Sequence, residues 1–375
     1  LSGVRKPWAR PVPNCSQVST APVLGNADDE VNGIAYRSDR VQPGDAFFCV
    51  VGMTTDGHSF AQDAIDRGAK VLVVERKVYL ADATDVTEIV VKDTRKAMAA
   101  AAANFYDHPS KDIALVGITG TNGKTTTTYL VEHIARVAGK RTGVIGTVGI
   151  RIGDEAEKSA HTTPESPDLQ QLFARMRDAR CDVVAMEVSS HALDLDRTWD
   201  AAFAVTAFSN LTQDHLDYHH TFEAYFEAKA RLFSKDYPAK RVICIDDKWG
   251  KELLRRSSVA EDSVVTTGFD PSAQIHPVDV QYAPTHTTVT LDVRGSLYTF
   301  DYPLVGRFNV ENIMCAFGIG LQLGFSADVV VEALEEAPQI PGRLERVNAP
   351  NTGGVSVFVD YAHTPDALEK ALASI

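Results

Sequence analysis

Short apolar runs separated by amphipathic stretches mark most of the chain. Three of these runs have the length of buried strands: Ile113–Ile118, Thr142–Val148 and Asp182–Val188. Leu130, Ile134 and Val137 recur at helical spacing, which predicts a helix over 125–138, and a second helix is expected near 168–177. Strands that alternate with helices predict an α/β fold with a parallel, doubly wound sheet, which binds its ligand at the carboxyl ends of the strands.

Two other regions differ from this central pattern. Residues from about 30 to 95 alternate strands with a helix, expected at Ala46–Val51, Phe60–Arg67 and Lys70–Val74. Period-two alternation predicts antiparallel strands at Val264–Gly268, Val278–Tyr282, Thr287–Val293 and Leu297–Tyr302. We interpret these four strands as a small antiparallel β appendage to the central domain, followed by helices over 309–323 and 326–337.

The length of 375 residues exceeds one ordinary core, so several domains are expected. Pro109 stops an alanine-rich helix, and a second boundary is expected near 338–343. A strand at Val355–Asp360 and a helix after Pro365 then begin a further domain, which the last residue of the chain cuts short. The predicted division is an N-terminal α/β domain over 1–110, a central domain over 111–341, and the start of a truncated α/β domain over 342–375.

Composition narrows the possible partners. The chain is 44% apolar and 23% charged, which is typical of a soluble globular protein, and its formal net charge of −13 argues against nucleic acid or an anionic membrane as the main partner. The five cysteines form no C-x-x-C pair, and we interpret them as reduced thiols: 15, 49, 181, 244 and 315. No apolar run approaches the roughly 20 residues that span a bilayer, and no signal-peptide core follows the N-terminus. A cytoplasmic enzyme without membrane insertion is expected.

The stretch Val116–Thr127 contains the clearest chemical signal. Glycines at 117, 120 and 123 follow the first apolar strand, and Lys124 and three threonines then open a helix. Glycine backbone N–H groups and a helix N-terminus together bind phosphate, Lys124 would neutralise the outer phosphates, and Thr125 would bind Mg²⁺. The usual G-x-x-x-x-G-K-[ST] pattern needs glycine at 118, where this chain has isoleucine. The order of strand, glycines, lysine, threonines and helix favours a phosphate loop over an incidental Gly-Lys corner.

Glu187 is an acid near the carboxyl end of the apolar strand 182–188. A buried carboxylate needs compensation for its lost hydration, so we favour a magnesium ligand over a structural acid that caps the next loop. Ser189 follows on the same edge of the sheet. The stretch Asn210–His220 holds three histidines and two aspartates, but their spacing matches no zinc pattern and favours a surface loop, with His215 the exception given below.

Lys229 lies on the apolar stripe of the helix 222–233, three residues after Phe226 and four after Tyr225. A buried ammonium must be neutralised, paired or chemically altered, and a neutral amine can add CO₂ to form an anionic, metal-binding carbamate. Snorkelling, with the amine in water, is an equally good reading of the pattern. Further along, Asn309 is expected as a helix N-cap, and Asn312 could read an adenine edge.

Together these segments resemble the Mur ligase family, whose members form amide bonds with ATP in peptidoglycan precursor synthesis. The matching motifs are G-T-N-G-K-T-T, T-T-P at 162–164, M-E-V-S-S-H-A-L at 186–193, N-L-T-Q-D-H-L-D-Y-H at 210–219, E-A-Y-F-E-A-K-A-R-L-F at 223–233, G-R-F-N-V-E-N at 306–312, P-G-R-L-E at 341–345 and D-Y-A-H-T-P at 360–365. Residues 36–45 and 55–58 are similar to the family's N-terminal domain. The most similar branch joins a diamino acid to UDP-MurNAc-L-Ala-D-Glu.

The resemblance implies a mechanism and roles for individual residues. ATP phosphorylates a D-glutamyl carboxylate, and the incoming amine displaces phosphate from the acyl phosphate. The nucleotide would contact Gly120, Thr121, Asn122, Gly123, Lys124, Thr125, Thr126, Asn312, Arg343 and Asp360. One Mg²⁺ would bind Thr125 and Glu187, and a second would bind Glu187, His215 and carbamylated Lys229. The UDP-muramoyl dipeptide would contact Thr162, Thr163, Ser189 and Arg197, with Ser38 at its uridine end.

Two departures from the family pattern bear on these expectations. Arg37-Ser38-Asp39-Arg40 replaces the commoner Asp-Ser-Arg order, and the family's Asn-Pro-Arg motif, which selects the amino acid, would lie beyond residue 375. This chain alone is therefore expected to bind the UDP substrate but to catalyse little or no ligation. The diamino acid is meso-diaminopimelate or L-lysine, with the former favoured by family frequency, and a monomer is favoured. Another Mur ligase, a folylpolyglutamate synthase or a non-catalytic ATP-binding module are the alternatives.

Overall fold

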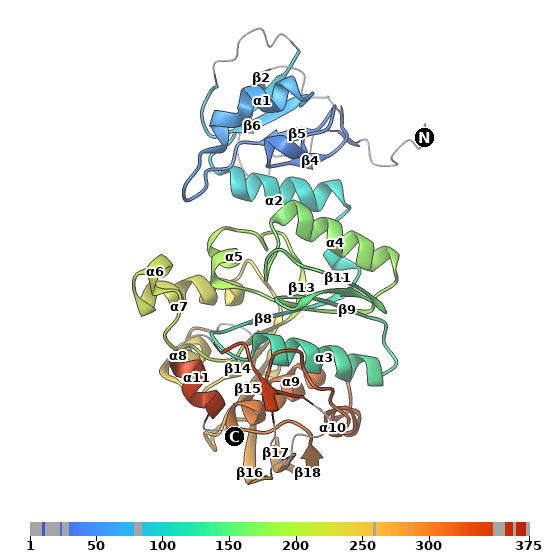
Figure 1. The fold of residues 1–375 in the computed structure, drawn as a ribbon, viewed down its shortest axis with the longest axis vertical. Helices are drawn as coiled ribbons and strands as arrows, with labels where there is room; N and C mark the ends of the chain where they lie inside the picture. The colour runs from blue at the N-terminus through green and yellow to red at the C-terminus, as the bar shows by residue number, and fades with distance from the viewer. Residues whose placement is uncertain are drawn as a thin grey trace. The chain divides into compact units, whose positions relative to one another are not determined.

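The computed structural model describes residues 10–11, 23–24, 30–78, 85–257, 260–283, 285–347, 357–362 and 365–372. The chain groups into two compact units. Unit 1 comprises 1–112, 164–174 and 195–201, and unit 2 comprises 113–163, 175–194 and 202–375. Figure 1 shows both units coloured along the chain.

Unit 1 is built on a five-stranded sheet in the order β2-β7-β6-β5-β4. Its strands are β2 Val23–Leu24, β4 Ile34–Ala35, β5 Ala46–Phe48, β6 Val71–Val74 and β7 Thr87–Val90. All neighbours are parallel except β2, which runs antiparallel to β7. Beside this sheet, β1 Arg10–Pro11 pairs with β3 Glu30–Val31.

Alternating side chains of the unit 1 strands form two apolar cores, because successive residues of a strand point to opposite faces. Phe48 and Val73 pack with residues of α2, Thr94–Phe105, whereas Phe47 and Leu72 pack with residues of α1, Ala61–Asp66. Short 3-10 helices complete the unit: η2 Ser38–Arg40, η3 Gly57–Phe60 and η4 Pro109–Lys111. The strand and helix predictions for 46–74 are confirmed, with ends one to three residues shorter.

Unit 2 is built on an eleven-stranded sheet in the order β11-β10-β9-β12-β8-β13-β14-β15-β16-β17-β18. Its strands are β8 Ala114–Thr119, β9 Thr142–Gly146, β10 Gly149–Ile152, β11 Glu155–Glu157, β12 Val183–Glu187, β13 Phe203–Phe208, β14 Lys240–Cys244, β15 Val264–Thr267, β16 Ile275–Tyr282, β17 Thr287–Val293 and β18 Ser296–Tyr302. The strands from β9 to β16 in this order are parallel, and both edges are antiparallel. The carboxyl ends of β8, β9, β12 and β13 therefore meet along one edge.

Three helices cover one face of this sheet: α3 Lys124–Val137, α9 Arg307–Gln322 and α10 Ala327–Glu335 (Figure 1). Their buried residues join those of the central strands in one apolar core, to which α3 contributes Leu130 and Ile134 at helical spacing. The remaining helices are α4 Ser166–Asp178, α5 Ser190–Asp194, α6 Leu216–His219, α7 Phe222–Ala230, α8 Lys248–Arg256 and α11 Pro365–Leu372, with 3-10 turns η5 Arg231–Phe233 and η6 Glu261–Ser263. β19 Glu345–Val347 pairs antiparallel with β20 Val357–Val359.

The structure corrects two sequence predictions of the fold. The strand predicted at Val264–Gly268 is parallel to both neighbours, because it lies inside the sheet and all four residues of β15 are buried. The antiparallel strands β16 to β18 consequently continue the main sheet. Asn309 is not the N-cap of α9, since the helix already begins at Arg307 with Gly306 as its N-cap.

Some predictions fall partly outside the described residues. Residues 355 and 356 of the strand predicted at 355–360 lie outside them, as does Cys15, while the other four cysteines are free and buried. The helix predicted after Pro365 is present as α11. Within the described ranges, every helix is too short or too polar to cross a lipid bilayer.

Candidate functional site

The loop from Gly120 to Gly123 joins β8 to α3 and needs glycine at both ends. Gly120 and Gly123 have φ values of +149° and +87°, which disfavour any residue with a Cβ. A Cβ at Gly120 would lie 1.9 Å from the Ser209 hydroxyl oxygen, and one at Gly123 would lie 2.3 Å from Oδ1 of Asn312. The backbone of this loop therefore packs directly against two polar side chains.

The segment that follows β13 braces this loop. The backbone N–H of Thr121 donates to the carbonyl of Asn210 at 2.9 Å, and that of Asn122 donates to Oδ1 of Asn210 at 2.9 Å. The Ser209 hydroxyl donates to the carbonyl of Asn122 at 2.6 Å. The polar stretch 210–220 is thus more than a surface loop, because its first residues fix the shape of the predicted phosphate loop.

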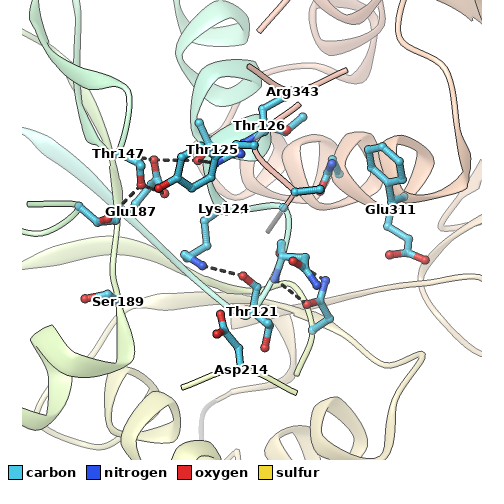
Figure 2. A pocket seen from close by; sticks show the side chains of 18 of the residues that line it. Thr121, Lys124, Thr125, Thr126, Thr147, Glu187, Ser189, Asp214, Glu311 and Arg343 are labelled. Carbon is cyan, nitrogen blue, oxygen red and sulfur yellow. Dashed lines mark hydrogen bonds between the residues drawn. The ribbon is translucent and has the colours of Figure 1, made fainter. Parts of the chain in front are cut away.

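Lys124, the first residue of α3, folds back over the loop. Its Nζ donates to the carbonyls of Gly120 at 3.0 Å and Thr121 at 2.7 Å, and Figure 2 shows it turned toward Thr121. Burial lowers the pKa of Lys124, while Glu187 and Asp214 oppose that shift. The ammonium group thus satisfies loop carbonyls beside the pocket that is described below.

Lys229 on α7 approaches the same loop from the other side. Its side chain is 1% exposed, so the snorkelling alternative is wrong. Nζ donates to the carbonyl of Gly120 at 2.8 Å and lies 4.6 Å from the centre of the Tyr225 ring. Burial first, and the charge of Lys124 second, hold the pKa of Lys229 well below its usual value. A low pKa favours the neutral amine.

Glu187, at the carboxyl end of β12, accepts hydrogen bonds from two neighbouring segments. The Thr125 hydroxyl donates to Oε1 at 3.0 Å, the Thr147 N–H donates to Oε1 at 2.8 Å, and the Thr147 hydroxyl donates to Oε2 at 3.1 Å. Figure 2 shows these groups together, with Arg343 on the far side of Thr125. Arg343 donates from Nη2 to the Thr125 hydroxyl oxygen at 3.0 Å. Glu187 is 1% exposed, so its charge relies on these donors.

The threonines of the T-T-P motif have different environments. Thr162 shares a hydrogen bond of 3.0 Å with the Thr147 hydroxyl and lines the pocket. Thr163 is buried and donates to the Glu187 carbonyl at 2.9 Å, while it accepts from the Ser189 N–H at 3.1 Å. Thr163 thus holds the end of β12 and does not line the pocket.

Histidine and tyrosine rings pack together next to Lys229. The His191 ring lies 4.8 Å from that of His215, centre to centre, and the His219 ring lies 5.1 Å from that of Tyr225. Burial lowers the pKa of His215, and burial together with His191 lowers the pKa of His219 to about 4. Nε2 of His219 is 2.9 Å from the Ser190 hydroxyl. Neutral imidazoles are therefore favoured at both positions.

A pocket of about 300 Å³ collects most of the predicted site residues of unit 2. Those that line it are Thr121, Asn122, Gly123, Lys124, Thr125, Thr126, Thr162, Glu187, Ser189, His215, Lys229, Asn312, Arg343 and Asp360. Gly120 contributes its carbonyl to the two lysines without lining the pocket. Asp360 accepts from the N–H groups of Leu344 and Ala362 at 2.7 Å each, which fixes the turn around Arg343.

The other two predicted residues belong to unit 1. Ser38 begins η2, and its hydroxyl hydrogen-bonds to the carboxylate of Asp63. This hydrogen bond and a second one from Arg67 lower the pKa of the Asp63 carboxyl. Arg197 pairs with Glu165 through Nη2 at 2.9 Å. Both residues therefore have local partners in unit 1.

Nine residues that line the pocket were not among the predicted site residues: Thr147, Ser190, Asn210, Asp214, Phe308, Glu311, Tyr361, Ala362 and Ala371. Thr147 directly follows β9, and only the strand order of the structure shows that β9 lies beside β12. Phe308 and Glu311 belong to the G-R-F-N-V-E-N motif, where only the asparagines were considered.

The oxygen donors of the pocket suit magnesium. Among the described residues no group of three or more His, Cys, Asp or Glu side chains could hold a metal ion. The hydroxyl of Thr125 and the carboxylate of Glu187 instead lie 3.0 Å apart and are both buried. Such hard oxygen ligands fit Mg²⁺ when phosphate and water complete its shell.

Two parts of the chain match models of one protein family. Residues 118–320 match the Mur ligase middle domain, and residues 30–106 match the catalytic domain of the Mur ligase family. The chain is 41% identical to the UDP-N-acetylmuramoyl-L-alanyl-D-glutamate–2,6-diaminopimelate ligase of Clostridium botulinum over 344 residues, which is 92% of this chain and 70% of that protein.

Solved structures extend the comparison. A structure of a ligase with the same name matches with a TM-score of 0.82 at 27% identity, over 98% of this chain and 74% of the other. The MurF ligase from Thermotoga maritima in complex with ADP matches with a TM-score of 0.63 at 19% identity, over 91% and 74% of the two chains. The second likeness concerns the fold alone.

Proposed function

The chain belongs to the Mur ligase family, and we propose that it uses ATP to join meso-2,6-diaminopimelate to UDP-MurNAc-L-Ala-D-Glu in cytoplasmic peptidoglycan precursor synthesis. The observation that carries this proposal is the 41% identity to a ligase of that name, over 92% of this chain and 70% of the relative. The same relatives favour diaminopimelate over L-lysine. They also make a folylpolyglutamate synthase the weaker alternative, since the solved synthase with ADP is 20% identical over 74% of this chain.

We place ATP in the unit 2 pocket. Its phosphates would contact the loop 120–123, Lys124 and Thr126, where backbone N–H groups and the start of α3 favour anions. Asn312, Arg343 and Asp360 would contact the adenosine, with Asn312 at the adenine edge. Arg343 contacts Thr125, so the guanidinium already lies beside the place proposed for the phosphates.

Thr125 and Glu187 would hold one Mg²⁺, which neutralises phosphate charge when it is bound. A second set of ligands would consist of Glu187, His215 and Lys229 as a carbamate. Two observations support the carbamate: the Lys229 amine is buried, and its pKa is lowered, which favours the neutral form that adds CO₂. His215 is likewise favoured in its neutral form, in which an imidazole nitrogen can bind a metal.

The residues of the chain then supply alignment and charge more than acid or base strength. Lys124 would leave its loop carbonyls for the β- and γ-phosphates and draw charge from the transferred group. The D-glutamyl carboxylate attacks the γ-phosphorus, ADP leaves, and an acyl phosphate forms. The amine of diaminopimelate attacks the carbonyl carbon of the acyl phosphate and loses a proton. Phosphate then leaves, and the amide bond is complete. Thr162, Ser189 and Arg197 would bind the dipeptide end of the UDP substrate, and Ser38 the uridine end, while Thr163 would hold the backbone of Ser189 in place.

We further propose that residues 1–110, 111–341 and 342–375 correspond to the UDP-substrate domain, the ATP domain and the start of the amino-acid domain. The division between the compact units at Asp112 and Ile113 supports the first boundary. A protein with the whole length of its relatives is then needed for full turnover.

The test is a substrate screen with such a full-length protein. ATP and UDP-MurNAc-L-Ala-D-Glu are supplied with meso-diaminopimelate, L-lysine or D-Ala-D-Ala, and a folate with L-glutamate is the control for the alternative enzyme class. We expect a UDP-muramoyl tripeptide mass with diaminopimelate and phosphate release that requires all three substrates. A product only with L-lysine, D-Ala-D-Ala or folate would replace the proposal, and ATP hydrolysis indifferent to every acceptor would favour a non-catalytic module.

A further inference from the structure

The segment Leu195–Ala201, which carries Arg197, belongs to unit 1 although its neighbours in sequence belong to unit 2. Two contacts connect this segment to α2 and to the turn that follows α2. The Lys96 ammonium lies 4.5 Å from the centre of the Trp199 ring, and Nδ1 of His108 is 3.9 Å from Oδ2 of Asp200. Both partners come from α2 or the turn that follows it.

The backbone on both sides of Arg197 adopts an uncommon conformation. Asp196 and Asp200 have φ values of +50° and +63°, in the left-handed region that side chains with a Cβ disfavour. Asp is among the residues that tolerate this conformation best, and backbone strain of this kind is concentrated where a side chain must be held in one direction. The turn is stabilised by backbone hydrogen bonds of 3.1 Å, from Trp199 to Asp196 and from Ala201 to Thr198.

A single carboxylate links this segment to α2. Glu165 accepts from Nη2 of Arg197 at 2.9 Å on Oε1 and from Nη1 of Arg95 at 3.3 Å on Oε2. The side chains of Arg95, Glu165 and Arg197 are 17%, 13% and 15% exposed. Nε of Arg95 is buried and has no hydrogen-bond partner among the described residues. One carboxylate thus bridges two guanidinium groups, and all three side chains are mostly buried.

We propose that Glu165 and Arg95 are positioning residues that hold Arg197 ready for an anionic group of the UDP-linked substrate. This inference rests on the proposed function, in which Arg197 is a substrate contact. Glu165 screens the two guanidinium groups from each other and fixes the direction of the Arg197 fork. Arg95 holds the other carboxylate oxygen of Glu165 and so fixes the position of that carboxylate.

Ordering in advance is the physical advantage of such an arrangement. A free arginine side chain loses much of its rotamer freedom when it is immobilised. Glu165 and the turn around Arg197 already order this side chain in the folded protein. The side chain therefore loses less conformational freedom when the substrate binds. Loss of the Glu165 charge should therefore weaken substrate binding only in a protein that still contains the Arg197 side chain.

A double-mutant cycle on substrate affinity tests this dependence. The dissociation constant of UDP-MurNAc-L-Ala-D-Glu is measured by calorimetry for the unaltered chain, Glu165→Gln, Arg197→Ala and the double variant. We expect Glu165→Gln to weaken binding about tenfold in the unaltered background and less than about twofold in the Arg197→Ala background. Equal factors in both backgrounds, or no weakening at all, would overturn the proposal. Arg95→Met should follow Glu165→Gln, and Arg95→Lys should retain part of the affinity.

Controls separate positioning from damage to the fold. ADP affinity should be the same in all variants, because the ADP pocket belongs to unit 2. Glu157→Gln makes the same chemical change in an exposed Glu–Arg pair, that of Glu157 with Arg175 at 2.8 Å, and should leave both affinities unaltered. If the unaltered chain binds ADP but not the UDP substrate, the proposed function fails as well. If it binds both and Glu165→Gln has no effect, only this inference fails.

Discussion

Lys124 and Lys229 donate to one acceptor, the carbonyl oxygen of Gly120, at 3.0 and 2.8 Å. Two buried ammonium groups on one oxygen repel each other, so the protein favours a state in which one of them is neutral. Burial first and the charge of Lys124 second lower the pKa of Lys229. Asp214 opposes the pKa shift of both lysines, whereas Glu187 opposes that of Lys124. These contacts support the proposal that Lys229 is the amine that forms the carbamate.

Replacing Lys229 with methionine should abolish the ligase reaction without harm to the fold. Methionine fills the same apolar space and removes a buried amine, so the melting temperature should stay level or rise. Ligase turnover of the full-length protein should fall at least about 100-fold. The ¹³C carbamate resonance that forms in labelled bicarbonate should disappear.

Lys248→Met is the matched control for that variant. Lys248 is exposed and lies 4.5 Å from the centre of the Trp249 ring, so it makes the same type of contact away from the pocket. Its turnover and the carbamate resonance should be unaltered. A carbamate signal that survives in Lys229→Met would assign the modification to another amine.

Gly123→Ala should impair nucleotide binding, and Gly139→Ala should not. Both glycines have positive φ, +87° and +74°, so both substitutions carry a backbone cost of about 1 kcal/mol. Only at Gly123 does the new Cβ meet another group, Oδ1 of Asn312 at 2.3 Å, whereas Gly139 has open space. Calorimetry should show ADP affinity reduced at least about tenfold for Gly123→Ala and unchanged for Gly139→Ala. Equal affinities would mean that Asn312 has no part in the nucleotide site.

The Thr125 hydroxyl should matter for magnesium more than for the nucleotide itself. Thr125→Val removes the group between Glu187 and Arg343, so ADP affinity in Mg²⁺ should fall about tenfold or more and change less in EDTA. Thr128→Val is the control on the same helix, since its hydroxyl is buried and has no partner among the described residues. That variant should keep its affinity and gain up to about 1 kcal/mol of stability. An equal loss in EDTA and in Mg²⁺ would argue against Thr125 as a metal ligand.

His219 should make unit 2 less stable in mild acid. Its pKa is about 4 in the folded protein and about 6.5 in an unfolded chain, so the folded state binds fewer protons between these values. The free energy of unfolding should therefore decrease by about 1 to 3 kcal/mol as the pH falls from 6.5 to 4, and then level off with respect to this group. Urea unfolding across this range measures it. His219→Gln should flatten the slope, and the exposed His161→Gln should leave it as it is.

The apolar periodicity predicted the unit 2 core well, because β8, α3 and β12 are specified by local pattern. Glu187 was placed near the end of its strand for the same reason. The orientation of Val264–Gly268 could not be read, since a fully buried strand looks alike in parallel and antiparallel sheets. The sequence also did not show which strands lie next to each other in the sheet. The contacts of Thr147 with Glu187 and of Glu165 with both arginines depend on which strands and helices lie side by side.

Unit 1 is assembled from three separate stretches of the sequence, 1–112, 164–174 and 195–201. A fragment that ends at Asp112 would lack Asp168, which accepts from the Tyr36 hydroxyl at 2.6 Å, and Glu165, the partner of Arg95. Chimaeras that exchange N-terminal regions between relatives must therefore carry both later stretches with them. A chimaera that exchanges residues 1–112 alone would combine polar side chains of one relative with non-matching partners of the other, even if both parts folded.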